Sequence, residues 1–477
     1  MPTTAVVLAR TLAARGVRRL FGLPGGEVAE ILGACRQAGL DFVLARHENS
    51  ACLMATATAE LTGRPGVVLT TLGPGATNAV NGVANAFLER APLLVLSAQV
   101  STAAAAVLPH QRVPLEELFR PITKWSHTLT GEDTAAVVHR ALDLAAGGRP
   151  GPVYLGVPSD VARGEDRRNG PSPCREPAPP AAGPAEAKRA VELIARARRP
   201  VALVGIGLDP RTGQPGLLRW LEAARMPVAV TPKAKGLVPE DHPLFLGTCT
   251  GMAGDRLLTE FLAQADLLVG LGFDPVEAIR PFYAERPFLS IARWSIAEPN
   301  FAPACELVGD PGAALAAMLP DIETPHDWRL QEVAAFRRRL AAFLAPPGAE
   351  GGTGLPPSRV IARLRQLVPP DTLLAVDTGA HKLLVGQLWS CSRPQSYFVS
   401  HGLSTMGMAL PAAVGLKLER PERPVLALTG DGGLAMVLAE LETAIGAAST
   451  GRARDRMRAI RALAQGYDLA TVAGIFD

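Results

Sequence analysis

The sequence lacks the features that mark several classes of protein. Its six cysteines are scattered, with no C-x-x-C pair and no spacing typical of metal ligands. This pattern favours reduced thiols in a cytosolic protein, so we expect a cytoplasmic location. No apolar run approaches the length of a membrane-spanning helix, so we expect no membrane partner.

A charge imbalance is also lacking. The chain has 48 Lys and Arg against 45 Asp and Glu, a formal net charge of +3 over 477 residues. A nucleic acid or an acidic membrane is therefore not expected as the main partner. Hydrophobic residues make up 48% and charged residues 19%, which is typical of a globular protein and excludes a disordered one.

Three apolar-rich blocks are present, separated by two stretches rich in Pro and Gly. Within the blocks, short apolar runs bounded by Gly and Pro predict buried parallel strands, and they alternate with segments of helical period. The runs are 66–71, 92–98, 200–207, 227–231, 265–272, 373–377 and 424–429. This alternation predicts an α/β fold of three doubly wound parallel-sheet domains, at 1–165, 185–345 and 358–477.

The third block contains a glycine-rich turn between a predicted strand and a predicted helix. Gly430, Asp431, Gly432 and Gly433 follow the run 424–429 and precede a helical segment at 434–445. Such a turn lets backbone N–H groups and a helix N-terminus approach a diphosphate. Its carboxylate could hold Mg²⁺, which prefers oxygen ligands. Alone, Asp-Gly is equally common in ordinary tight turns.

Further motifs give this turn its context. After a gap of six residues the sequence continues Glu440-Leu441-Glu442-Thr443-Ala444. Upstream lie, in order, Phe21 to Gly26, then Arg46-His47-Glu48, then Gly73-Pro74-Gly75-Ala76-Thr77-Asn78. Together these segments resemble the thiamine-diphosphate-dependent enzyme family, over about residues 3–446.

The resemblance implies thiamine diphosphate and Mg²⁺ as cofactors, and a role for each matching residue. Glu48 would hydrogen-bond the aminopyrimidine and activate the cofactor, and Met406 would bend it. Asp431 would be the Mg²⁺ ligand. The other implied cofactor-binding residues are Gly379, Ala380, His381, Ser404, Gly430, Gly432 and Gly433.

The subtype implied is that of acetolactate synthases. His110-Gln111 lies thirteen residues before Lys124, an arrangement similar to theirs, and Gln111 would line the substrate pocket. Gly25, Gln111, Lys124 and Glu48 form the implied catalytic set. The implied reaction condenses two pyruvate molecules, with loss of CO₂, to acetolactate. In this family the site lies across a subunit interface, so a homodimer or homotetramer is implied.

The run Gly272 to Glu277 resembles the catabolic branch of these synthases, which has no flavin, so we expect no FAD. Two other interpretations of the activity remain open. One is a related 2-oxo acid decarboxylase or acyltransferase. The other is a catalytically impaired homologue, because the family's motif closes with an Asn-Asn pair and this sequence has no Asn after Asn300. We therefore expect a third domain that is incomplete and truncated after about residue 446.

Residues 452–477 differ in character from the preceding domain. Their arginines accompany an apolar stripe of helical period, which resembles the first two helices of a helix-turn-helix. The simpler interpretation is a solvated charged helix, because two helices without a third form no stable DNA-reading unit. Nucleic acid is therefore not expected as a partner.

Overall fold

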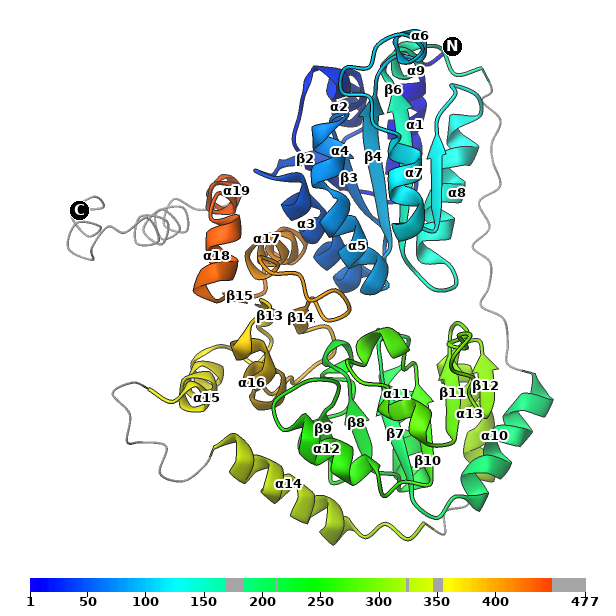
Figure 1. Cartoon of the computed structure of the whole chain (residues 1–477), viewed down its shortest axis with the longest axis vertical. Helices are drawn as coiled ribbons and strands as arrows, with labels where there is room; N and C mark the ends of the chain where they lie inside the picture. The colour runs from blue at the N-terminus through cyan, green and yellow to red at the C-terminus, as the bar shows by residue number, and fades with distance from the viewer. Residues whose placement is uncertain (168–182, 212, 323–325, 346–354, 448–477) are drawn as a thin grey trace. The chain divides into compact units, whose positions relative to one another are not determined.

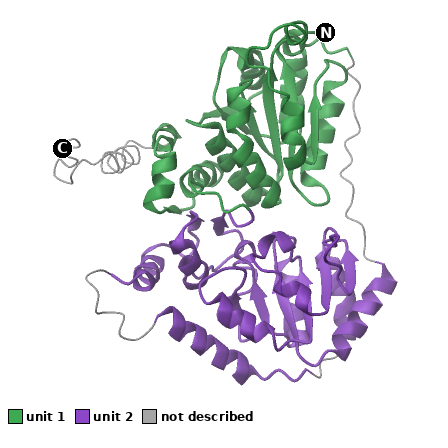
Figure 2. Cartoon of the chain, in the orientation of Figure 1, with its two compact units in different colours: residues 1–177, 403–477 green, residues 178–402 purple. Residues whose placement is uncertain are grey.

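The computed structural model describes residues 1–167, 183–211, 213–322, 326–345 and 355–447. The chain divides into two compact units. Residues 1–177 with 403–477 form the first, and residues 178–402 form the second (Figure 2). The predicted linker 166–184, most of the predicted linker 345–357 and the basic tail 452–477 lie largely or wholly outside the described residues.

The first unit is built on a six-stranded parallel sheet of order β2-β1-β3-β4-β6-β5 (Figure 1). Its strands are β1 (Arg19–Gly22), β2 (Asp41–Leu44), β3 (Gly66–Thr70), β4 (Leu93–Gln99), β5 (Trp125–Thr128) and β6 (Pro152–Pro158). The central strands β3, β4 and β6 are buried along nearly their whole length. This explains their continuous apolar runs, since helices cover both faces of the sheet.

Two hydrophobic cores lie on opposite faces of this sheet. One face is covered by α1 (Thr4–Ala14), α2 (Ala29–Gln37), α8 (Thr134–Ala146) and α9 (Ser159–Arg163). The other is covered by α3 (Glu48–Thr62), α4 (Pro74–Asn78), α5 (Val80–Leu88) and α7 (Leu115–Phe119), while α6 (Thr102–Ala105) lies in a loop after β4.

Local sequence features determine where these helices begin and end. Thr3 caps α1 by accepting the N–H of Val6, and Gly63 ends α3 at a φ of +70°.

Three helices from the C-terminal part of the chain complete the first unit. They are α17 (Ala409–Glu419), α18 (Asp431–Val437) and α19 (Glu440–Ala447), and β15 (Val425–Leu428) precedes α18. Helix α17 packs against α3 at Gly415, where a Cβ atom would lie 2.5 Å from the carbonyl oxygen of Met54. Only glycine allows this approach without a shift of the helix backbone.

The second unit contains another six-stranded parallel sheet, of order β12-β11-β10-β7-β8-β9. Its strands are β7 (Pro200–Val204), β8 (Val228–Val230), β9 (Phe245–Thr248), β10 (Leu267–Leu271), β11 (Phe288–Ala292) and β12 (Cys305–Val308). Helices α10 (Pro184–Arg196), α11 (Gln214–Ala224) and α13 (Pro311–Met318) cover one face, and α12 (Asp255–Leu262) and α14 (Leu330–Leu344) the other.

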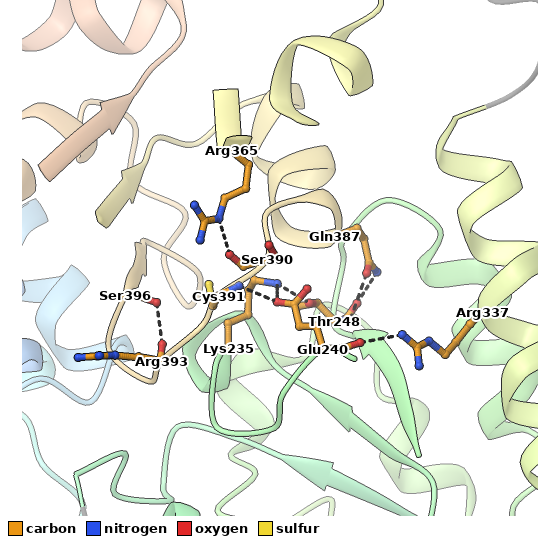
Figure 3. Close-up of polar contacts among 10 residues, drawn as sticks. All are labelled: Lys235, Glu240, Thr248, Arg337, Arg365, Gln387, Ser390, Cys391, Arg393 and Ser396. Carbon is orange, nitrogen blue, oxygen red and sulfur yellow. Dashed lines mark hydrogen bonds and ion pairs between the residues drawn. The ribbon is translucent and has the colours of Figure 1, made fainter. Parts of the chain in front are cut away.

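A third α/β segment begins in this unit. It contains α15 (Pro357–Leu367), α16 (Ala380–Leu388) and the parallel pair β13 (Leu373–Val376) and β14 (Tyr397–Val399). A polar network joins the segment to the second sheet (Figure 3). Buried Lys235 pairs with Glu240 at 2.7 Å, and Glu240 also accepts the N–H of Cys391. The side-chain amide of Gln387 bonds both backbone groups of Thr248 on β9.

The predicted fold class, three parallel-sheet α/β domains, is confirmed. The strand predicted at 265–272 is β10, for example, and the one predicted at 424–429 is β15. One helix prediction needs correction, because 434–445 is not one helix but parts of α18 and α19 with a break between them. The predicted end of the third domain near 446 borders on residues outside the described ranges and stays a prediction. None of the described helices combines the length and apolar character needed to cross a bilayer.

Candidate functional site

Glu48 is a buried carboxylate at the end of a strand. It is the first residue of α3, directly after the β2 strand and the N-cap residue His47, and only 6% of its surface is exposed. The amide of Asn78 donates a hydrogen bond to its Oε2 at 3.1 Å. Among the described residues its other oxygen, Oε1, has no hydrogen-bond partner. One oxygen is thus fixed by the protein while the other is available to a ligand.

Two glycines allow the chain to close around this carboxylate. A Cβ atom on Gly75 would lie 2.2 Å from Oγ1 of Thr71 and 3.2 Å from Oε1 of Glu48. A Cβ atom on Gly25 would lie 2.5 Å from Cγ2 of the same threonine. The structure therefore brings the predicted residues Gly25 and Glu48 together around Thr71. The sequence motifs gave no role to Thr71, and they included Asn78 without its bond to Glu48.

Gln111 reaches the same edge of the sheet. Both Gly73 and Gln111 have positive φ, +53° and +55°, and a Cβ atom on Gly73 would lie 3.0 Å from the carbonyl oxygen of Gln111. The loop after β3 thus carries Gly75 beside Glu48 and Gly73 beside Gln111. A cavity of about 450 Å³ is lined by Gly73 and Gln111.

Lys124 lies elsewhere. It precedes β5, and its N–H donates to the carbonyl of Pro152 at the start of β6. Its ammonium donates to the carbonyl oxygens of Leu144 and Gly147 at the C-terminal end of α8. In a parallel sheet these are the amino ends of the strands, whereas Glu48 and Gln111 lie beyond the carboxyl ends. The structure does not bring Lys124 to the candidate site, and its catalytic role stays a prediction.

The predicted diphosphate turn and the loop before α17 lie together in the first unit. The ε-methyl group of Met406 is 3.6 Å from the place of a Cβ on Gly432. A Cβ atom on Gly407, which has a φ of +76°, would lie 2.9 Å from Cγ1 of Val437. Ser404 in the same loop also has a positive φ, +55°. Gly430 is the N-cap of α18, and no side chain occupies its cap. The N–H groups at this helix start are thus left to another acceptor.

Asp431 is the first residue of α18, and its side chain is exposed. Within the described ranges no group of three or more His, Cys, Asp or Glu side chains is arranged to hold a metal ion. A metal bound by Asp431 would therefore draw its other ligands from diphosphate, water, backbone carbonyls or uncharged side chains.

Gly379, Ala380 and His381 belong to the second unit, at the start of α16 after β13. A Cβ atom on Gly379 would lie 2.9 Å from the His381 ring. The Nε2 atom of His381 is buried and has no hydrogen-bond partner among the described residues. A buried ring nitrogen without a partner is suited to a bound polar group.

One residue of the site region was missed as a site residue in the sequence. Glu440, buried at 1% exposure, accepts the backbone N–H groups of Arg46 and His47 at 3.0 Å each. The hydroxyl of Thr443, which donates to Oε2 of Glu440 at 2.7 Å, also lies 3.2 Å from the carbonyl oxygen of Leu44. Helix α19 is thereby bonded to the backbone that leads directly into Glu48. The motif Glu440 to Ala444 was the available signal, but its partners could not be seen in the sequence.

Three family models match the chain. Residues 2–119 match the "Thiamine pyrophosphate enzyme, N-terminal TPP binding domain", residues 187–318 the central domain, and residues 377–448 the "C-terminal TPP binding domain". The C-terminal domain is thus present in the chain. All three matches follow the order of the predicted blocks.

Full-length relatives agree with these matches. The chain is 32% identical to a probable acetolactate synthase large subunit of Methanocaldococcus jannaschii, covering 92% of this chain and 77% of that protein. It is 31% identical to a catabolic acetolactate synthase of Raoultella terrigena, covering 92% and 80%. It is 33% identical to the large subunit of acetolactate synthase isozyme 2 of Escherichia coli, covering 91% and 78%. With the buried Glu48 and the glycine turn in place, these matches show that the chain belongs to the thiamine pyrophosphate enzyme family, as an acetolactate synthase-like transferase.

Proposed function

We propose that this protein, with thiamine diphosphate and Mg²⁺ bound, condenses two 2-oxo acids with loss of CO₂, converting pyruvate to acetolactate. The observation that carries the proposal is the buried Glu48 carboxylate, fixed by Asn78 through one oxygen and free at the other. The names of the relatives, acetolactate synthases, support the choice of reaction.

The residues fit the cofactor. Glu48 would hold the aminopyrimidine ring through Oε1, and the uncapped turn Gly430 to Gly433 would receive the diphosphate. His381 belongs to the second unit, and its role toward the cofactor rests on the family resemblance. Asp431 would supply one carboxylate ligand for Mg²⁺.

The chain's own contribution to the reaction is to hold and move protons and to orient substrate. When bound, thiamine diphosphate supplies the electron sink that decarboxylation needs. Glu48 exchanges a proton at Oε1, and the hydrogen bond from Asn78 to Oε2 fixes the orientation of the carboxylate. Gln111 and Gly25 border the space beside it and position the 2-oxo acid.

We also propose that the second unit binds no flavin. In open α/β sheets a ligand binds beyond the carboxyl ends of the strands where the strand order reverses, here between β7 and β10. Contacts of the chain with itself at this place support the proposal. The carboxylate of buried Glu277 accepts the N–H of Ile206 at 3.0 Å, a donor that a bound nucleotide would otherwise use.

The glycines at this place support the same conclusion. A Cβ atom on Gly205 would lie 2.6 Å from both Glu277 Oε2 and Phe273 Cα. One on Gly207 would lie 2.9 Å from the carbonyl oxygen of Gly272. The loops after β7 and β10 therefore approach each other closely at this place, and this close approach supports the proposal.

The proposal also covers the oligomeric state of the protein and its location in the cell. We infer at least a homodimer, and a homotetramer is compatible. Met406, Met436 and Leu44 are 43%, 66% and 42% exposed, and large apolar side chains at a surface favour an interface. The described cysteines are all free and buried, as in a protein of the reducing cytoplasm.

Calorimetric titration with thiamine diphosphate and Mg²⁺, followed by an acetolactate assay on pyruvate, tests the proposed function. Tight Mg²⁺-dependent binding with turnover supports it, and Glu48→Gln should then lower the rate by about 10²-fold or more, because proton transfer is lost. Glu132→Gln, an equal charge change at an exposed residue, should not. Binding without acetolactate would indicate a decarboxylase or acyltransferase. No binding by the folded protein would indicate an inactive homologue.

A further inference from the structure

The cavity beside Gln111 is larger than pyruvate requires. Its volume of about 450 Å³ compares with about 30 Å³ for one water molecule and falls in the range of pockets that enclose whole ligands, roughly 300–1,000 Å³. Its walls come from the carboxyl ends of three strands, at Gln99 on β4, Thr128 on β5 and Pro158 on β6. The loop and helix α7 from Gln111 to Arg120 close the other side.

One loop connects this cavity with the surroundings of Glu48. Gly73 lines it, and Gly75, two residues on, lies so close to Glu48 that an added Cβ atom would be 3.2 Å from Oε1. The cavity and Glu48 thus lie at the same edge of the sheet, beyond the carboxyl ends of its strands.

Three polar side chains of the lining are joined by hydrogen bonds. Thr128 donates to Oε2 of Glu116 at 3.0 Å, and the amide of Gln99 donates to Thr128 at 3.3 Å. A Cβ atom on Gly156 would lie 2.1 Å from the Gln99 amide nitrogen, so glycine is needed for this arrangement. The half-buried Glu116 carboxylate accepts only one of these bonds, which leaves further lone pairs for a ligand donor.

Two cations complete the lining. Arg112 and Arg120 border the cavity, and neither guanidinium has an ion-pair or hydrogen-bond partner within the part of the chain that the structure describes. A guanidinium binds carboxylate strongly and with defined geometry. The lining of the cavity thus offers donors for a carboxylate and an acceptor for a hydroxyl.

We propose that the cavity selects a second substrate that is a hydroxylated 2-oxo acid, with Glu116 as the specificity-determining residue. The substrate's carboxylate binds Arg112 or Arg120, and its hydroxyl donates to Glu116. This inference rests on the proposed function for its role in condensation, but the binding itself does not depend on turnover.

A matched pair of probes tests it. Hydroxypyruvate and 2-oxobutanoate differ in having a hydroxyl or a methyl group at the end of the chain. Calorimetric titration of the full chain with each, without thiamine diphosphate, should show at least about tenfold tighter binding of hydroxypyruvate, as expected for a hydrogen bond to a charged group. Glu116→Gln and Thr128→Val should each reduce this ratio, whereas the exposed control Glu132→Gln should preserve it.

Thermal unfolding of each variant confirms that it is folded. Equal binding of the two acids by the unchanged protein would overturn the inference, as would no binding of either. A preference that survives in both folded variants would overturn the role of Glu116. The pyruvate assay with cofactor reports separately on the proposed function, so failure of one proposal is distinguishable from failure of the other.

Discussion

The carboxylate of Glu440 accepts a hydrogen bond from the backbone N–H of His47, 3.0 Å away and one residue before Glu48. The same carboxylate accepts the N–H of Arg46, and its Oε2 also accepts the hydroxyl of Thr443. Residues almost four hundred positions apart in the chain thus fix the start of α3. Because Glu48 is the first residue of that helix, its position depends on α19.

Replacing Glu440 by Gln should therefore destabilise the first unit and also lower the proposed activity. A Gln amide keeps one oxygen for the backbone N–H groups, but it loses the negative charge that strengthens these bonds and places an NH₂ group where Oε2 lies 3.2 Å from the Arg46 nitrogen and 2.7 Å from the Thr443 hydroxyl. The expected loss is about 1–3 kcal/mol in the free energy of unfolding, measured by denaturant titration. Glu422→Gln, the same change at an exposed residue, should stay within about 0.5 kcal/mol of the unchanged protein. Equal stability of the two variants would contradict the role of Glu440.

Gly75→Ala adds a single methyl group, but it should lower both the stability of the first unit and the affinity for thiamine diphosphate. The added methyl group would lie 2.2 Å from Thr71 Oγ1 and 3.2 Å from Glu48 Oε1, so Thr71 or the loop must move. We expect a fall of about 1–3 kcal/mol in unfolding free energy and weaker binding of thiamine diphosphate by calorimetry. Gly33→Ala, on the exposed face of α2 with no atom within 4 Å of the new methyl, should instead stabilise by about 0.4–1 kcal/mol. Similar effects of the two changes would count against a tight fit at Gly75.

The strands and the order of the motifs could be predicted because their signals are local. The apolar runs at 66–71 and 265–272 carry enough pattern to predict β3 and β10. The break between α18 and α19 could not be predicted, because nothing in the helical period of 434–445 marks it. Glu440, the first residue after this break, makes hydrogen bonds to the distant residues Arg46 and His47, and such bonds depend on how distant segments pack.

The difference between local and long-range signals also explains which site residues could be predicted from the sequence. Glu48 and Gly25 belong to recognisable motifs, and strand order then brings them together. Thr71 enters the site only through close contacts with two glycines, which no sequence spacing reveals. Lys124 was assigned by its distance in sequence from Gln111, but the parallel sheet places the two at opposite strand ends.

Lys124→Met decides between two roles for that residue. Its ammonium bonds the carbonyls of Leu144 and Gly147, and a cation at a helix C-terminus contributes about 0.3–1 kcal/mol. A structural role therefore predicts a small loss of stability and little change in kcat for acetolactate formation. A fall in kcat of a hundredfold or more with unchanged stability would show that Lys124 is catalytic after all.

Glu277 should make stability depend on pH in a specific window. Burial raises the pKa of its carboxyl group from 4.5 to about 8 in the folded protein. Between these values the folded state holds a proton that the unfolded state has lost, so stability falls as pH rises from about 4.5 to about 8 and then levels off. The slope from this residue is at most about 1.4 kcal/mol per pH unit.

Glu277→Gln removes the titrating group and keeps an oxygen that can accept the N–H of Ile206. The stability of this variant relative to the unchanged protein should therefore increase with pH across that window, as measured by thermal unfolding at several pH values. Glu285→Gln, an exposed change in the same unit, should show no such trend. A stability difference that stays constant from pH 4.5 to 8 would mean that Glu277 is already ionised in the fold. In that case the carboxylate at the β7–β10 crevice would be a standing negative charge, and its exclusion of a phosphate-bearing flavin would be electrostatic as well as steric.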